Sequence, residues 1–302
     1  MARLILRHEP HLQAPSLIVG FAGWANAAGL SIDVVSQLQS LVATDAIGTI
    51  AAPECYVITN PSLANRPITA IRGGLIEELR FPVTEVHALK EAGTQPELLL
   101  IQGPEPDLHW PDFVEVIWSL IGRFGVRRVY TIGSYYDQIP HTRPPHVTAV
   151  VSDLRLKAEL RSQHVDFTSY EGPTSIQTFL LYTCQQRQIE GVSLWGGLPP
   201  YLRGSYPKGV VRVLSILSKL IGFSIDTGAL QAWVTEFEGA LRQEVAKNDE
   251  LQELIKQLEA AYDRSVSDTD VQHGDEIVEE IQQFLRQRHR PGNTPPSSDQ
   301  PQ

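Results

Sequence analysis

The fold is decided by one stretch near the N-terminus, residues 17–38, which reads LIVGFAGWANAAGLSIDVVSQL. Residues 17–21 form an almost continuous apolar run, which is typical of a strand that is buried on both faces. From Ala27 to Leu41 the apolar residues recur every three or four positions, as in an amphipathic helix. A buried strand that leads through a glycine-rich loop into a helix predicts an α/β fold.

The same alternation continues to about residue 194. Further strands are expected at 47–52, 98–101, 128–132, 147–151, 165–168 and 192–194, and helices at 111–124, from Leu154, and at 175–186. Two short runs, 68–71 and 76–81, are joined through Gly73-Gly74 and predict a β-hairpin that adds antiparallel pairing to the sheet. We therefore expect a three-layer αβα sandwich around a mostly parallel, mixed sheet.

The pattern changes after residue 223. Residues 226–262 form one long helical pattern with apolar residues on one face and acidic residues on the other. A polar break at 265–274 separates it from a second helical pattern at 275–288, so the two are expected to form a helical hairpin. The expected organisation is an α/β domain at 1–223, a helical appendage at 224–289 and a disordered tail at 290–302.

Charge and composition exclude several classes of protein. The formal net charge of -10 argues against nucleic-acid binding, which needs a positive field. We expect no membrane span and no signal peptide, because no apolar run has the necessary length. The two cysteines, Cys55 and Cys184, lie far apart in the sequence, which suits a reducing, cytoplasmic location. No histidine, cysteine or acidic set has metal-ligand spacing, so neither a metal nor another cofactor is expected.

The loop after the first strand is one candidate site. It includes Gly23, Trp24 and Asn26, and N–H groups at the start of a helix attract anions. Its spacing matches neither the dinucleotide nor the P-loop fingerprint. The alternative interpretation is a tight turn in which Asn26 caps the helix.

Two further loops carry polar residues. Three prolines stiffen residues 137–145. His141 and Arg143 could bind an anion there, or serve a subunit contact together with Asp137, and the alternative is a rigid surface loop. In the loop at 170–175, Thr174 or Ser175 is expected to cap the next helix. No G-x-S-x-G elbow supports a nucleophilic serine, and we assign no catalytic residue.

Tyr201 follows the last predicted strand, in the segment WGGLPPYL at 195–202. Its ring could line a cleft or pack within the loop. Because parallel strands end at one edge of a sheet, the three loops that carry Gly23 to Asn26, Asp137 to Arg143 and Thr174-Ser175 could converge on a single cleft. Cys184 lies in a helical pattern and is expected to be a buried small residue rather than a nucleophile.

Several segments, taken in order, resemble the family of the second proteasome assembly chaperone. They are GFAGW at 20–24 with Ala28-Gly29, PHTRP at 140–144, GPT at 172–174, LEAAYD at 258–263, GDEI at 274–277 and Phe284-Leu285. The resemblance spans roughly residues 15 to 289 and implies a phosphorylase/hydrolase-like αβα sandwich that forms a homo-oligomer, with a trimer as the first expectation. Eukaryotic relatives help to build proteasome α-rings, and bacterial members are also labelled ATP-grasp superfamily proteins. This sequence shows no glycine-rich phosphate loop and no metal-binding acid set to support ATP use.

Two departures from the family pattern affect the expected function. Many relatives carry Pro-His-Tyr where this chain has Pro199-Pro200-Tyr201, and archaeal relatives that dock on the proteasome end in a hydrophobic-Tyr-X tail, whereas this chain ends in SDQPQ. That docking mode is therefore not expected. The leading hypothesis is a non-catalytic oligomeric scaffold or assembly-chaperone-like protein with an unidentified partner. The alternative is a small-molecule or nucleotide-binding protein or enzyme with a cleft at the carboxyl ends of the strands.

Overall fold

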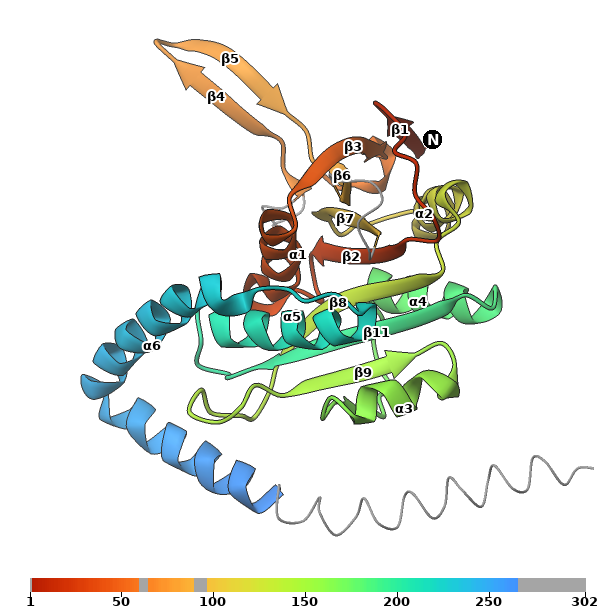
Figure 1. Cartoon of the computed structure of the whole chain (residues 1–302). Helices are drawn as coiled ribbons and strands as arrows, with labels where there is room; N and C mark the ends of the chain where they lie inside the picture. The colour runs from red at the N-terminus through yellow and green to blue at the C-terminus, as the bar shows by residue number, and fades with distance from the viewer. Residues whose placement is uncertain (1, 60–64, 90–96, 266–302) are drawn as a thin grey trace, which may run out of the picture.

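The computed structural model describes residues 2–59, 65–89 and 97–265 of the 302-residue chain. Within these ranges the centre of the molecule is a nine-stranded sheet with the strand order β1-β3-β6-β7-β2-β8-β11-β9-β10 (Figure 1). Its strands are β1 (Arg3–Leu6), β2 (Ser16–Ala22), β3 (Thr44–Ala51), β6 (Thr84–Leu89), β7 (Leu98–Pro104), β8 (Arg128–Tyr136), β9 (Val147–Val151), β10 (Asp166–Phe167) and β11 (Glu190–Leu198).

The strands β7, β2, β8 and β11 form a parallel centre. Ile18 of β2 is aligned with Leu100 of β7 on one side and with Tyr130 of β8 on the other, and all three side chains are fully buried. The apolar run at 17–21 is buried because β2 has a neighbouring strand on each side and a helical layer on each face.

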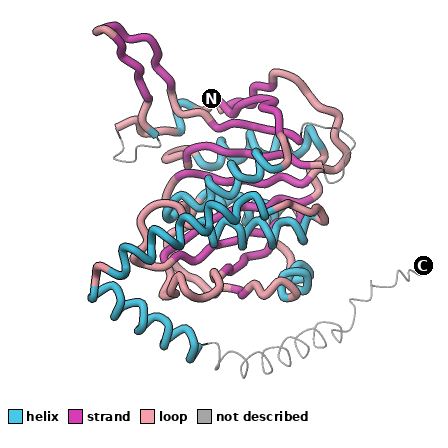
Figure 2. The backbone as a smooth tube through the Cα atoms, turned by 60° about the vertical axis from the view of Figure 1, so that its left-hand side comes forward, coloured by secondary structure: helices cyan, strands magenta, loops and turns pink. Residues whose placement is uncertain are grey.

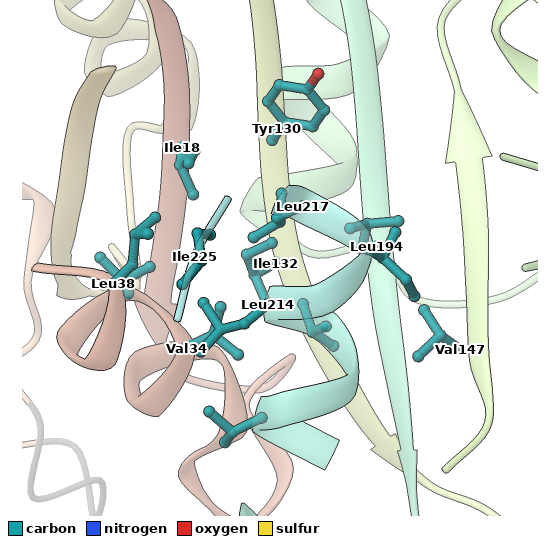
Figure 3. Packing of buried hydrophobic residues seen from close by; sticks show 14 of the residues in the cluster. Ile18, Val34, Leu38, Tyr130, Ile132, Val147, Leu194, Leu214, Leu217 and Ile225 are labelled. Atoms are coloured by element: carbon teal, nitrogen blue, oxygen red, sulfur yellow. The ribbon is translucent and has the colours of Figure 1, made fainter. Parts of the chain in front are cut away.

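Helices cover both faces of the sheet. One face carries α1 (Leu30–Leu41) and α5 (Pro207–Ile221), and the other carries α2 (Trp110–Phe124) and α4 (Ile176–Gln186). A short helix, α3 (Lys157–Arg161), lies on the side of α5. In the core of the first face, Val34, Ile132 and Leu214 pack together across the gap between α1, β8 and α5 (Figure 3). The predicted αβα sandwich with a mixed sheet is therefore confirmed.

The antiparallel part of the sheet does not come from the predicted hairpin. β6 pairs with β7, β3 with β6, β1 with β3 and β9 with β11, all antiparallel. The hairpin of β4 (Ile68–Arg72) and β5 (Leu75–Arg80) forms its own two-stranded sheet and projects from the body (Figures 1 and 2). The prediction that this hairpin adds to the main sheet is wrong, because almost every side chain of both strands is exposed instead of packing against the core.

β1, β6 and α5 are absent from the sequence-based prediction. The edge strand β1 and the inner strand β6 include charged or polar residues such as Arg3 and Glu85, which interrupt an apolar run. α5 contains several valines and isoleucines, which lower intrinsic helix propensity. Its apolar stripe is buried against the first-face core, and that burial stabilises the helix despite the β-branched content.

The predicted helix at 226–262 is interrupted near Asn248. α6 (Gln231–Ala246) ends there, and residues 249–265 form a second helical stretch whose first turn is capped by Asn248, since its Oδ1 accepts from the N–H of Leu251 at 3.0 Å. The predicted helix at 275–288, and with it the helical hairpin and the tail, lies outside the described residues.

No helix in the described part of the chain combines the length and the apolar character that a membrane crossing requires.

Candidate functional site

A crevice opens at the carboxyl edge of the sheet between β2 and β7. These two strands are parallel neighbours, but β2 leads to α1 on one face whereas β7 leads to α2 on the other. Loops that diverge in this way leave a gap at the strand ends, which is where open α/β sheets place ligands. A pocket of about 610 Å³ lies at this position.

The pocket brings together two of the loops that the sequence singles out. Its lining residues are Ala22, Gly23, Trp24, Asn26, Asn65, Glu105, Pro106, Asp107, Trp110 and Thr174. Gly23, Trp24, Asn26 and Thr174 are candidates from the sequence. Asn65, Glu105 and Asp107 are not, although Glu105 and Asp107 directly follow a buried strand and this position is a signal for site residues.

Glu105 ties the loops of the pocket together. Its Oε2 accepts a hydrogen bond from the backbone N–H of Trp24 at 2.7 Å, and its Oε1 accepts from the N–H of Ile176, the first residue of α4, at 3.1 Å. A Cβ atom on Gly23 would collide with the Glu105 side chain, so this close approach requires glycine. The two N–H groups that would otherwise attract an anion are thus occupied by a carboxylate of the protein itself.

Asn65 and Asp107 form the polar wall of the pocket. The Nδ2 of Asn65 donates to Asp107 Oδ2 at 2.7 Å and to the carbonyl of Glu105 at 3.4 Å. Asp107 Oδ2 also accepts from the N–H of Val57 at 2.8 Å. Asn65 is only 4% exposed, and its buried Oδ1 has no hydrogen-bond donor among the residues that the structure describes.

The predicted cap Ser175 is confirmed at the same edge, and Asn26 acts on α1 from three positions before its N-cap residue, which is Gly29. Asn26 Oδ1 accepts from the N–H of Ser31 at 2.9 Å, in the first turn of α1. Ser175 is the N-cap residue of α4, and its Oγ accepts from the N–H of Thr178 at 3.3 Å. Both side chains satisfy N–H groups that a helix end leaves unpaired.

Cys184 is fully buried, as the sequence predicts, and burial raises the pKa of its thiol to about 12. A thiol with so high a pKa carries almost no thiolate at neutral pH and is a poor nucleophile.

The remaining sequence candidates do not line this pocket. His141 Nδ1 lies 2.7 Å from the hydroxyl of Tyr201, which also accepts from the backbone N–H of His141 at 2.8 Å. Arg143 donates to both carboxylate oxygens of Asp263, at 2.8 and 2.7 Å, and Glu259 lies 3.4 Å from it. The loop at 137–145 is therefore fastened to the helical stretch 249–265 of the same chain.

Asp137 belongs to a charged bridge that the sequence does not reveal. His146 Nδ1 lies 2.8 Å from Asp137 Oδ2, and its Nε2 lies 3.0 Å from Asp166 Oδ2. Hydrogen bonds to Asp137 and then to Asp166 raise the pKa of His146 to about 9. Burial acts to raise the pKa of Asp137, but the hydrogen bond and charge of His146 outweigh it and lower that pKa. The bridge connects the end of β8 to the starts of β9 and β10, and we interpret it as a structural contact between these strands.

The described residues offer no arrangement for a metal ion, since no three of their histidine, cysteine, aspartate and glutamate side chains gather in a way that could hold one. The polar and aromatic side chains that line the pocket are two acids, two amides, one hydroxyl and two indoles.

These features define an α/β sandwich protein with an open sheet. A polar pocket lies at the carboxyl ends of β2 and β7, where the connections leave to opposite faces of the sheet. The helical stretch 249–265 is held at the same edge of the sheet by Arg143. The chain belongs to the PAC2 family, whose model matches residues 17–245.

Solved structures agree with this assignment. A protein of unknown function from Mycobacterium tuberculosis is 22% identical, with a TM-score of 0.79 over 90% of this chain and 92% of that one. A PAC2 family protein from Streptomyces avermitilis is 28% identical, with a TM-score of 0.69 over 80% and 99%. A proteasome-assembly chaperone homologue from M. tuberculosis is 24% identical, with a TM-score of 0.71 over 80% and 99%. A search of curated proteins gives no match.

Proposed function

We propose that this chain is a homo-oligomeric scaffold of the assembly-chaperone type, located in the cytoplasm, that acts through protein–protein contacts and not through catalysis. The observation that carries the proposal is the hairpin β4–β5, which projects from the body as an arm (Figure 1). Its apolar side chains Ile71, Ile76 and Leu79 are exposed. The family supports it as well, since one similar protein is described as a proteasome-assembly chaperone homologue.

Three exposed apolar side chains of the hairpin, Ile71, Ile76 and Leu79, lie on one of its faces, whereas Ile68 and Leu75 lie on the other. The register pairs Thr69 with Leu79 and Ile71 with Ile76, and residues that face each other across a pair share a face. Ile71 is 60%, Ile76 72% and Leu79 56% exposed. The opposite face carries the charged side chains of Glu78 and Arg80, which pair with each other at 3.5 Å. We name the face of Thr69, Ile71, Ile76 and Leu79 the apolar hairpin face.

A second copy of the chain is the partner that we assign to the apolar hairpin face. An isolated two-stranded hairpin is at best marginally stable in water, so this arm gains from being covered. The face carries no charge, so it adds no like-charge pair at the contact itself when it docks on another copy of the chain. An arm that reaches onto a different surface of its neighbour makes a heterologous contact. Such a contact forms a ring when the rotation between neighbours closes, and the ring that we propose is a trimer.

The test is to remove the apolar hairpin face and measure the assembly. Burying one such side chain contributes roughly 1.5–3 kcal/mol, so the double variant Ile71→Ser, Ile76→Ser should weaken association by at least about 100-fold. Sedimentation velocity should then show folded monomers. The control Leu154→Ser removes a side chain of similar exposure, 70%, that lies elsewhere. An unchanged oligomer in the double variant would refute the role of the hairpin.

A second candidate function is that of a small-molecule binder. The pocket between β2 and β7 favours it, because the volume and the position are those of ligand sites in open α/β sheets. A thermal-shift panel of nucleotides and metabolites tests this candidate, and a rise in melting temperature with one class of compound supports it.

A further inference from the structure

The tip of the β4–β5 hairpin is apolar and carries a single charge. Residues 70–76 read AIRGGLI, in which Arg72 is the charged residue. Leu75 and Ile76, next to the glycine turn, are 73% and 72% exposed. Both views show the hairpin pointing away from the body (Figures 1 and 2), and a six-residue strand such as β5 spans about 20 Å. The tip is therefore placed to reach another molecule.

Three exposed apolar side chains border the pocket between β2 and β7. Trp24 lines this pocket and is 62% exposed. Leu108, which is 46% exposed, directly follows the lining residue Asp107, whose Oδ2 accepts from the N–H of Val57 at 2.8 Å. The N–H of Leu108 donates to the carbonyl of Cys55 at 3.0 Å, so the two segments lie side by side. We name Trp24, Val57 and Leu108 the apolar rim.

The apolar rim has the features of a protein-binding surface. Exposed apolar residues around a polar hollow are typical of interaction sites, and tryptophan is enriched among the residues that dominate binding. The backbone of Trp24 is held by its hydrogen bond to Glu105 at 2.7 Å. A partner that binds this loop therefore loses little free energy in ordering it.

The charges of the hairpin tip and of the pocket are complementary. Glu105 and Asp107 line the pocket, and none of its lining residues is lysine, arginine or histidine. The Arg72 side chain is 78% exposed and pairs with Glu77 at 3.3 Å, a surface contact of a kind that contributes little. Both acids of the pocket already accept hydrogen bonds within their own chain. The attraction for Arg72 is therefore that of a negative field rather than a new ion pair.

We propose that the hairpin tip of one copy docks in the pocket between β2 and β7 of the next copy, with the apolar hairpin face against the apolar rim. The contact is heterologous, because the arm and the rim are different surfaces of the chain. The pocket of about 610 Å³ has room for side chains of the tip. The inference rests on the proposed oligomeric scaffold, and it gives the pocket a polypeptide occupant in place of a small molecule.

Removal of the apolar rim tests the docking surface. The double variant Trp24→Ser, Leu108→Ser keeps the backbone N–H groups that bond to Glu105 and Cys55, so circular dichroism should show a folded chain. Its association should weaken by at least about 30-fold in sedimentation velocity, because a tryptophan anchor dominates such a contact. The control Leu154→Ser lies at the opposite edge of the sheet and should assemble like the unmodified chain. A folded rim variant that assembles as tightly as the unmodified chain would overturn the proposal.

Cross-linking locates the tip on the rim without removing either surface. Cys55 and Cys184 are the two cysteines of the chain and both are buried, so introduced thiols are the accessible ones. A short bismaleimide should join Ile76→Cys, Leu108→Cys chains into covalent oligomers on a denaturing gel. The control pair Ile76→Cys, Leu154→Cys should remain as single chains, and so should Ile76→Cys alone. Covalent dimers of Ile76→Cys alone would mean that hairpins dock on one another, which contradicts the proposal.

The outcomes separate this contact from the proposed function. An assembly that dissociates in Ile71→Ser, Ile76→Ser, but neither dissociates in the rim variant nor cross-links through Leu108→Cys, keeps the hairpin as the arm and refutes the rim as its receptor. An unmodified chain that is monomeric refutes both the scaffold and the docking. Dissociation of both folded variants together with the Ile76→Cys, Leu108→Cys cross-link supports both.

Discussion

The carboxylate of Glu105 accepts a hydrogen bond from the backbone N–H of Trp24 at 2.7 Å, across 81 positions of sequence. This bond joins the ends of β2 and β7, and the second oxygen of Glu105 extends the link to the start of α4. One side chain thereby fixes three loops at the switch point of the sheet. The carboxylate of Glu105 therefore both holds the pocket loops together and contributes negative charge to the pocket.

The absence of a side chain at Gly23 is expected to be essential for this arrangement. In Gly23→Ala the new methyl group collides with Glu105, so the loop has to shift and the unfolding free energy should fall by about 1.5–3 kcal/mol, the value of a hydrogen bond to a charged group. Gly122→Ala is the matched control, because Gly122 lies in α2 with open space around it, and alanine there should stabilise by up to about 1 kcal/mol. Urea denaturation measures both, and equal effects of the two substitutions would contradict the account.

His146 should make stability depend on pH. Its pKa is about 9 in the folded chain and about 6.5 in the unfolded chain, so the stabilisation is fully present below about pH 6.5 and is lost as the pH rises through 9. We expect a loss on the order of 1–2 kcal/mol, reduced by solvent screening because the side chain is 32% exposed. His146→Gln should remove most of this dependence in urea titrations at pH 6, 7.5 and 9. A variant as pH-dependent as the unmodified chain would rule out the bridge as the cause.

Arg143 is expected to hold the helical stretch 249–265 on the carboxyl edge. Its guanidinium donates to Asp263 and lies near Glu259, and the hydrogen bond to Arg143 also lowers the pKa of Asp263. Arg143→Ala should increase backbone hydrogen exchange within 249–265 while leaving exchange in the β-sheet unchanged. Raising the salt concentration should produce part of the same effect in the unmodified chain.

Arg155→Ala is the control for that experiment. Arg155 forms its ion pair with Asp153, two residues away in sequence, and not with the C-terminal stretch. Its loss should leave exchange in 249–265 as it is in the unmodified chain. If both variants exchange alike there, the contact with Asp263 does not fasten the stretch.

Local features of the site are predictable from the sequence, and long-range contacts are not. Asn26 and Ser175 are recognisable as caps because a cap acts on residues only a few positions away. The partnership of Glu105 with Trp24 depends on which strands become neighbours, and so does the bridge from His146 to Asp166. The apolar pattern predicts the layers, but it does not give the order of the strands.

The hairpin shows a second limit of the sequence pattern. The residues of β4 and β5 have the composition of strands, and the glycine pair at 73–74 marks their turn correctly. Composition does not reveal whether an apolar strand packs on its own core or is exposed, as Ile71 and Ile76 are here. That distinction depends on the tertiary structure, and it is the basis of the proposed function.

The mass of the unmodified chain in solution tests the central claim most directly. Size-exclusion chromatography with multi-angle light scattering, at micromolar concentration and physiological salt, should give a multiple of the 33.6 kDa chain mass, with three chains as the expected number. A single species of 33.6 kDa under these conditions would contradict the oligomeric scaffold.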